Sequence, residues 1–236
     1  MTIYVPIDTP DIDTAKRIAA LVTPAGCGIK LGMEFFNAHG PQGIAMVKAD
    51  FPEASLFIDL KYHDIPNTVA GAVRSIAKLA PDYLNVHASG GFDMMKAAKD
   101  ALQDESAKLG LKNTPKLLAV TVLTSIDARA LHQVGQGDDA EAQVERLAIL
   151  TKNAGLDGVV CSPLEIEIVR RACGPDFVTM VPGIRPADAA AQDQKRVMTP
   201  RDAALAGATH LVIGRPITQA PDPAQAARDI LASMAA

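Results

Sequence analysis

The chain is organised around Leu56-Phe57-Ile58-Asp59-Leu60-Lys61-Tyr62-His63-Asp64-Ile65-Pro66-Asn67-Thr68. The apolar run at 54–58 predicts a buried strand, and the run at 69–73 opens a helical pattern. Because side chains of a strand alternate between its two faces, Asp59 and Lys61 are expected on one face. Asp64 follows the strand and is expected in the turn. Three charges therefore gather where a strand ends and a helix begins.

The turn after these charges carries signals for a helix start. Pro66 has a preset φ that suits a chain leaving a strand, and Asn67 or Thr68 is expected to cap the helix. A surface ion pair beside a cap would be a simple explanation, although such pairs contribute little. Burying two carboxylates beside a lysine at a strand end is costly, so we favour a functional role.

Length and composition limit the alternatives. The 236 residues are 48% hydrophobic and 21% charged, which is ordinary for a globular protein that can bury a large core. The 4% aromatic content and the absence of Trp argue against a base-stacking surface. A net charge of −4 predicts no general attraction to nucleic acid or to anionic membranes.

Targeting and redox signals point to the cytoplasm. The residues at 1–8 contain no basic region typical of a signal peptide, and no apolar run is long enough to span a membrane. Cys27, Cys161 and Cys173 are odd in number and lack CxxC spacing, so neither a zinc site nor a disulfide framework is expected. Cys27 and Cys161 fall in apolar runs, so we predict that they are small buried side chains, in a reducing cytoplasm.

Eight apolar runs alternate with helical patterns along the whole chain. The expected strands cover residues 3–7, 26–32, 56–60, 83–87, 117–123, 158–161, 177–181 and 209–213. Alternating β and α units predict parallel strands joined by crossover helices. An open doubly wound sheet is the alternative, but no GxGxxG follows any strand. We predict an α/β fold, a single-domain (β/α)8 TIM barrel over residues 1–236.

Polar residues are concentrated at the expected strand ends, where barrel active sites lie. They are Asp8, Lys30, Asp59, Lys61, His87, Thr124, Ser125, Arg185, Gly214 and Arg215. The loops after the last two strands often hold phosphate, so Arg185, Gln194, Gly214 and Arg215 are candidates for that role. Lys195 and Arg196 are explained equally well as a solvated charged loop.

Residues 59–68 resemble the DxKxxDIPNT signature of the orotidine 5′-phosphate decarboxylase family. Segments at the other strand ends agree with it in order and spacing, namely 30–34, 86–88, 120–125, 160–165, 181–185, 193–196 and 212–216. The resemblance covers nearly the whole chain and is to the shorter bacterial form. Pro6 departs from it, because the family more often has a small apolar residue there and proline removes a ladder N–H.

The resemblance implies a carboxy-lyase that converts orotidine 5′-monophosphate to uridine 5′-monophosphate and CO2 in pyrimidine biosynthesis. It implies no metal and no organic cofactor. It also implies a homodimer in which Asp64 and Thr68 reach into the neighbouring subunit's site.

The same resemblance implies roles for individual residues. The catalytic charged tetrad is Lys30, Asp59, Lys61 and Asp64. Asp8 and Lys30 are expected to contact the ribose, and Thr124 and Ser125 the pyrimidine. The residues expected to contact the phosphate are Arg185, Gln194, Gly214 and Arg215. Asp59 and Thr68 are also expected to contact the substrate. The segment 186–192 is expected to be a lid.

The chemistry of the residues agrees with that reaction. Loss of CO2 leaves a carbanion in the ring plane, and an ammonium at that carbon stabilises the charge and then supplies a proton. Lys61 fits this role, because Asp59 and Asp64 favour its protonated form. His63 and His87 are not assigned catalytic roles, because the reaction needs a stronger cation than neutral imidazole.

Two other functions are considered. A related barrel with a DxK pattern could bind Mg2+ in a sugar-phosphate decarboxylase or aldolase, but its carboxylates must be free to ligate the metal. A barrel without activity could bind nucleotide only, and the complete set of charged residues argues against it. Loss of activity with EDTA would favour the first alternative, and binding without turnover the second.

Overall fold

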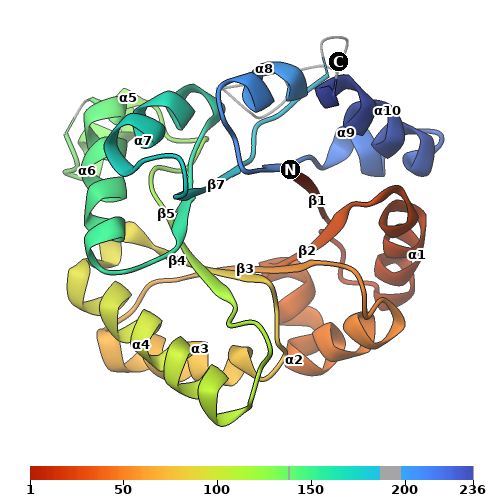
Figure 1. The fold of residues 1–236 in the computed structure, drawn as a ribbon, viewed down its shortest axis with the longest axis horizontal. Coiled ribbons are helices and arrows are strands. Elements are labelled where there is room, and N and C mark those ends of the chain that lie inside the picture. The colour runs from red at the N-terminus through yellow and green to blue at the C-terminus, as the bar shows by residue number, and fades with distance from the viewer. Residues whose placement is uncertain (138, 187–197, 236) are drawn as a thin grey trace.

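In the computed structural model, which describes residues 1–137, 139–186 and 198–235, eight parallel strands form one closed barrel (Figure 1). The strands are β1 (Thr2–Pro6), β2 (Gly28–Gly32), β3 (Leu56–Tyr62), β4 (Tyr83–His87), β5 (Lys116–Val120), β6 (Gly158–Val160), β7 (Val178–Val181) and β8 (His210–Val212). Each pairs with its neighbour in sequence, and β8 closes the barrel against β1. The predicted fold class is confirmed.

Helices surround the barrel on all sides in Figure 1. The α-helices are α1 (Ile12–Val22), α2 (Met33–Asp50), α3 (Pro66–Ala77), α4 (Phe92–Lys108), α5 (Ala128–Gln133), α6 (Ala140–Asn153), α7 (Ile166–Cys173), α8 (Pro200–Leu205), α9 (Arg215–Thr218) and α10 (Pro223–Ala235). Short 3-10 turns, η1 (Thr23–Ala25), η2 (Ala88–Gly90) and η3 (Pro163–Glu165), complete them. Asp11 and Asp127 cap α1 and α5 by accepting backbone hydrogen bonds.

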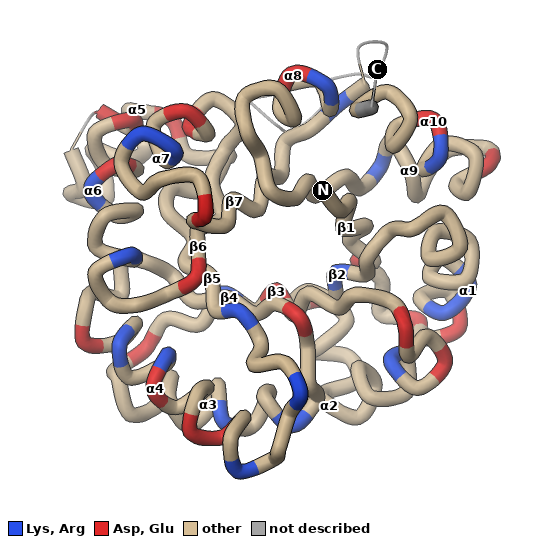
Figure 2. The backbone as a smooth tube through the Cα atoms, viewed as in Figure 1, with Lys and Arg blue, Asp and Glu red and all other residues tan. Residues whose placement is uncertain are grey.

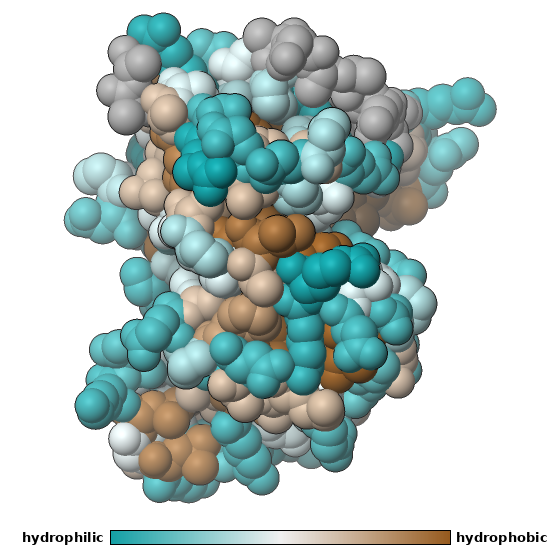
Figure 3. All heavy atoms as spheres, turned by 90° about the vertical axis from the view of Figure 1, so that its right-hand side faces the viewer, coloured by the Kyte–Doolittle hydropathy of each residue, from teal (hydrophilic) through white to brown (hydrophobic). Residues whose placement is uncertain are grey.

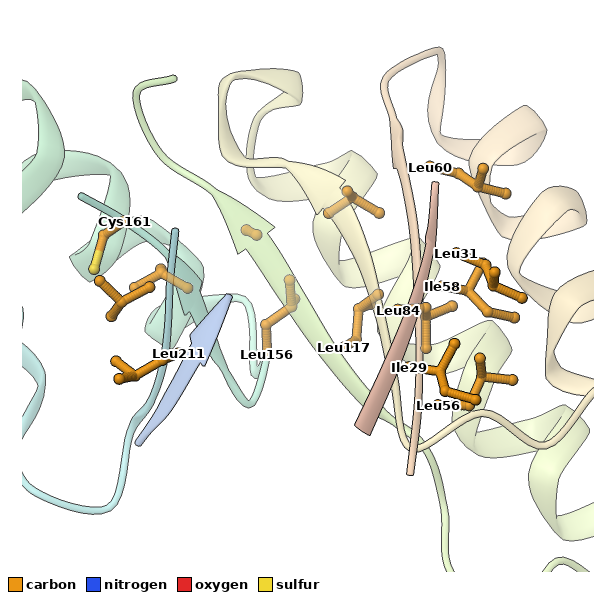
Figure 4. Close-up of a cluster of buried hydrophobic side chains, with 14 of the residues drawn as sticks. Ile29, Leu31, Leu56, Ile58, Leu60, Leu84, Leu117, Leu156, Cys161 and Leu211 are labelled. Atoms are coloured by element: carbon orange, nitrogen blue, oxygen red, sulfur yellow. The ribbon is translucent and has the colours of Figure 1, made fainter. Parts of the chain in front are cut away.

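Two apolar layers follow from the alternation of strand side chains. Ile58 and Leu60 belong to the outer layer, with side chains directed toward the helices (Figure 4). The inner layer fills the barrel with Tyr4, Phe57, Tyr83, Leu118, Val120, Val160, Val178, Met180 and Val212. Because Ile58 and Leu60 face outward, Asp59 between them faces the interior. The same periodicity that builds the core therefore directs a carboxylate into it.

Aromatic rings pack in the part of the barrel interior that lies away from the charged residues. Tyr4 packs edge-on against Phe57, Tyr83 and His210, with ring centroids 5.5 to 6.0 Å apart. Gly28 makes room for this packing, because a Cβ there would lie 2.6 Å from Cε1 of Tyr4. This packing fills the barrel interior near the amino ends of the strands.

Some element boundaries differ from those expected. β3 continues to Tyr62, whereas β5 ends at Val120 and not at residue 123. Helix α3 begins at Pro66 with Ile65 as its N-cap residue, so the expectation that Asn67 or Thr68 caps it is wrong. Proline suits the first helical position, because the N–H that it lacks would have no intrahelical partner there.

Figure 3 shows one face of the molecule. The face in Figure 3 carries hydrophilic side chains with smaller apolar patches between them. Within the described ranges, no helix combines the length and the apolar character needed to cross a bilayer.

Candidate active site

A chain of charged side chains crosses from β1 to β3 at the carboxyl ends of the strands. Nζ of Lys30 lies 2.9 Å from Oδ2 of Asp59, and Nζ of Lys61 lies 2.6 Å from its Oδ1. Asp8, just after β1, lies 3.8 Å from Nζ of Lys30. Figure 2 shows charged positions on β2 and β3 at the ring of strands. Both oxygens of Asp59 are therefore held by lysines.

Electrostatics keeps this cluster ionised. Burial alone would lower the pKa of Lys30, but the charges of Asp59 and Asp8 outweigh it and raise that pKa above its usual value. Burial alone would raise the pKa of Asp59, but Lys30 and Lys61 hold it well below its usual range. A carboxylate and an ammonium group thus stay charged in the barrel at neutral pH.

The backbone of Lys61 has an unusual conformation. Its φ of 52° lies in the left-handed region, which side chains other than glycine seldom adopt. The register between β3 and β4 shifts here, from the pair Ile58–Leu84 to the pair Tyr62–Val86. Three residues of β3 thus lie opposite one residue of β4. This β-bulge holds Lys61 at the mouth of the barrel.

Asn85, the residue opposite the bulge, is a site residue that the sequence analysis missed. It is 1% exposed, its Nδ2 donates to Oδ1 of Asp59 at 2.7 Å, and its Oδ1 accepts from the backbone N of Lys61 at 2.8 Å. The available signal was a polar residue in the middle of the apolar run 83–87, which places an amide in the barrel interior.

An inner cavity of about 210 Å3 opens beside the charged chain. Asp8, Lys30, Asp59 and Lys61 form its charged wall, and Thr124 adds a hydroxyl. The rest is mostly apolar, with contributions from Pro6, Phe57, Val120, Val122, Leu123, Val160, Cys161, Pro182 and Val212. Such a cavity suits a flat ring that places one polar edge against the lysines.

An outer cavity of about 430 Å3 shares Pro6, Asp8, Pro182 and Val212 with the inner one. Arg185, Gly214 and Arg215 lie in its wall. Arg185 is buried, and its Nε makes no hydrogen bond within the described residues. Burial and the nearby Arg215 lower the pKa of Arg185. Two guanidinium groups near one another favour an anion between them.

Other predicted site residues lie outside these cavities. Asp64 and Thr68 are exposed on the turn before and at the start of α3, and Asp64 accepts a hydrogen bond from the backbone N of Ile65. Ser125 is exposed, next to Thr124. Gln194 and most of the expected lid at 186–192 lie outside the described residues, as do Lys195 and Arg196.

The two histidines considered earlier pack near Lys61. The rings of His63 and His87 are 5.8 Å apart and tilted by 37°. Burial, together with His63 and Lys61, lowers the pKa of His87. A neutral imidazole is therefore expected at neutral pH, and it supplies no cation to the cavity.

These features define a class of protein. A (β/α)8 barrel with buried lysine–aspartate pairs at the carboxyl ends of its strands, an apolar ring-sized cavity and an arginine-lined outer cavity is built as an enzyme for a small anionic substrate. The model of the orotidine 5′-phosphate decarboxylase / HUMPS family matches residues 1–230, and the chain belongs to that family.

Individual relatives agree over the full length. The chain is 50% identical to orotidine 5′-phosphate decarboxylase of Moorella thermoacetica, over 98% of this chain and 91% of the relative. It is 52% identical to orotidine 5′-phosphate decarboxylase of Rhodospirillum rubrum, over 96% of this chain and 91% of the relative. The solved structure of the Lactobacillus acidophilus orotidine 5′-phosphate decarboxylase is 37% identical, with a TM-score of 0.87, over 100% of this chain and 99% of that one. The family resemblance is confirmed, and with it the expectation of a carboxy-lyase.

Proposed function

We propose that this chain converts orotidine 5′-monophosphate to uridine 5′-monophosphate and CO2 in pyrimidine biosynthesis, without a metal or an organic cofactor. The observation that carries the proposal is the Lys30–Asp59–Lys61 chain, which lies against an apolar ring-sized cavity. The names of the relatives support the choice of substrate.

Lys61 is the proposed general acid. Breaking the bond to CO2 leaves an electron pair in the plane of the pyrimidine, where the π system cannot delocalise it. An ammonium at that carbon stabilises the developing charge and then donates its proton to form the C–H bond. The contact of 2.6 Å with Asp59 holds the ammonium in place before the substrate arrives.

Asp59 has two roles in this mechanism. It forms ion pairs with both lysines, and it lies beside the position proposed for the departing carboxylate. Because Lys30 and Lys61 hold its pKa well below the usual range, it remains an anion and repels that carboxylate. Asp64 of the neighbouring subunit completes the proposed tetrad.

The remaining contacts would orient the nucleotide. Asp8 and Lys30 are proposed for the ribose, and Thr124 with Ser125 for the pyrimidine. Arg185, Gln194, Gly214 and Arg215 are proposed for the phosphate. The outer cavity supports the last assignment, because Arg185, Gly214 and Arg215 lie in its wall. Binding energy at the phosphate would align the ring with Lys61 and close the proposed lid at 186–192.

We propose a homodimer with shared sites. The segment 63–68, including the largely exposed Ile65, presents Asp64 and Thr68 to solvent in a single chain. A partner would bury this segment and receive both side chains.

We also propose a cytoplasmic location, since Cys27 and Cys173 are buried thiols suited to a reducing compartment.

A magnesium-dependent sugar-phosphate enzyme is the alternative. A metal ion at Asp59 would have to displace at least one lysine from a carboxylate whose two oxygens both accept hydrogen bonds. This arrangement favours the cofactor-independent reaction.

The deciding experiment is an ultraviolet assay of the purified protein with orotidine 5′-monophosphate, with and without EDTA. We expect turnover that EDTA does not change. Turnover that EDTA abolishes would favour the metal-dependent alternative, and binding of uridine 5′-monophosphate without turnover would indicate a binding protein.

A further inference from the structure

Asn85 occupies the point where the charged cluster meets the β-bulge. Its side chain donates to Oδ1 of Asp59, the same oxygen that Nζ of Lys61 contacts, and accepts from the backbone N of Lys61. One amide thus contacts both the side chain that orients Lys61 and the backbone that carries it.

The acceptor half of the amide stabilises the bulge. In a regular ladder, the N–H of Lys61 would find a backbone acceptor on β4, but the register shift between Ile58 and Tyr62 interrupts the ladder there. A partly buried N–H without an acceptor would destabilise the fold. The carbonyl oxygen of Asn85 takes that hydrogen bond and helps to maintain the φ of 52° at Lys61.

The donor half fixes the carboxylate. Oδ1 of Asp59 receives Nδ2 of Asn85 and Nζ of Lys61, and Oδ2 receives Nζ of Lys30. These three donors together hold the carboxylate of Asp59 in one orientation. An amide is suited to this place, because it combines a neutral donor with an acceptor, whereas a carboxylate would repel Asp59.

We propose that Asn85 is a positioning residue, which holds Asp59 and Lys61 in the geometry that the reaction requires. The expected effect on kcat rests on the proposed decarboxylation. The expected effect on the position of Lys61 does not depend on the substrate. The Lys61 ammonium and the Asp59 carboxylate do the chemistry, and Asn85 acts through them.

The test compares Asn85→Ala and Asn85→Asp with the unmodified protein. We expect kcat of Asn85→Ala to fall by about 10- to 100-fold, because a displacement of a catalytic group by about 1 Å has that effect. KM should change by no more than about three-fold, because the proposed phosphate contacts are in the outer cavity. A kcat within two-fold of the unmodified protein for both variants would overturn the inference.

The pH profile of Asn85→Asp is a second readout. A protonated carboxyl group offers a donor and an acceptor, as the amide does, but an ionised one repels Asp59. The charged and titratable groups around this position are Asp59 and Lys61 of β3, Lys30 of β2, His87 of β4 and His63 beside it. We expect the ratio of variant to unmodified kcat to rise as pH falls, and a constant ratio would contradict the inference.

Thr179→Val is the matched control. Thr179 is a fully buried strand residue that accepts from the backbone N of Thr209, and it does not line either cavity. We expect this variant to lower Tm without changing kcat or its pH profile. If Asn85→Ala does not fold, Asn85→Ser replaces it, because Ser keeps a polar side chain that is too short to contact both Asp59 and the backbone N of Lys61 as the amide does.

A crystal structure of Asn85→Ala, or of Asn85→Ser if needed, separates this inference from the proposed function. We expect the Lys61 ammonium to leave Asp59 and its φ to relax. An unchanged Lys61 would overturn the inference even if the protein is an active decarboxylase. A displaced Lys61 in a protein that never decarboxylates the nucleotide would reject the proposed function and retain the positioning role.

Discussion

Lys61 combines two features at one position. Its ammonium contacts Asp59 at the edge of the inner cavity, and its backbone lies in the left-handed region, which costs a non-glycine residue of the order of 1 kcal/mol or more. A regular strand would continue without that cost. The bulge places the ammonium at the cavity, in agreement with the role proposed for Lys61 as general acid.

Lys61→Ala tests that role directly. We expect kcat to fall by about 10⁴-fold or more, because the variant loses both charge stabilisation and the proton donor. Binding of uridine 5′-monophosphate, measured by calorimetry, should survive, since the proposed phosphate contacts remain.

Lys16→Ala is the control for the loss of a lysine. Lys16 forms an ion pair of 2.8 Å with Asp50 on the outer surface, and its removal should leave kcat unchanged. A nearly normal kcat in Lys61→Ala would reject the mechanism.

At the scale of elements, α7 is tied to the barrel by one side chain. The guanidinium group of Arg170 donates hydrogen bonds to backbone oxygens and to threonine hydroxyls. The backbone acceptors are Gly207, Gly174 and Pro175, at 2.8 to 3.3 Å, and Phe177. The hydroxyl acceptors are Thr179 and Thr209, at 3.0 and 2.8 Å. These partners precede or begin β7 and β8, at the end of the barrel away from the charged cluster. Arg170 therefore joins a helix to two strand entrances.

Replacing this arginine should lower stability without affecting chemistry. We expect Arg170→Met to lower the free energy of unfolding by about 3 kcal/mol or more, because several partly buried acceptors lose a charged donor. Denaturant unfolding measures the change, and kcat measured well below Tm should stay normal.

Arg171→Met is the matched control on the same helix. Arg171 is exposed, so its replacement should change the free energy of unfolding by less than about 0.5 kcal/mol. Equal effects of the two substitutions would show that the network around Arg170 contributes nothing specific.

At the scale of the whole molecule, the charged cluster of a single chain contains Lys30, Asp59 and Lys61, while Asp64 lies exposed on a turn. The proposed homodimer resolves this separation, because a neighbouring subunit would supply the fourth charge. Each active site would then depend on two chains.

Mixing two inactive variants tests the shared site. Lys61→Ala and Asp64→Ala, after subunit exchange, should regain up to about a quarter of the normal activity, because half of the dimers are hybrids with one intact site of two. The assay is turnover after mixing, with exchange verified by differently tagged subunits.

The control mixture combines Lys61→Ala with Asp59→Ala. Both residues come from β3 of the same subunit, so no hybrid contains an intact site and activity should not return. Failure of the first mixture to recover, with exchange proven, would reject the role of Asp64 across the interface.

The sequence by itself determined the barrel and the charged cluster. Mostly apolar runs such as 83–87 and 209–213 indicate parallel strands that are buried on both faces. This pattern can be identified without knowing which strands pair with each other. Asp59 and Lys61 stand out in such a run, because an ionised side chain in a buried strand needs a partner. The 50% identity of the chain to the Moorella thermoacetica relative agrees with these predictions.

Only the tertiary structure decided how β3 and β4 fit together. The bulge at Lys61, the two hydrogen bonds of Asn85 and the end of β5 at Val120 depend on the register between strands that are distant in sequence. Local propensity carries no record of that register, since pairing is settled by packing across the closed barrel. The sequence therefore identified the charged groups, whereas the folded chain determined which oxygen each of them contacts.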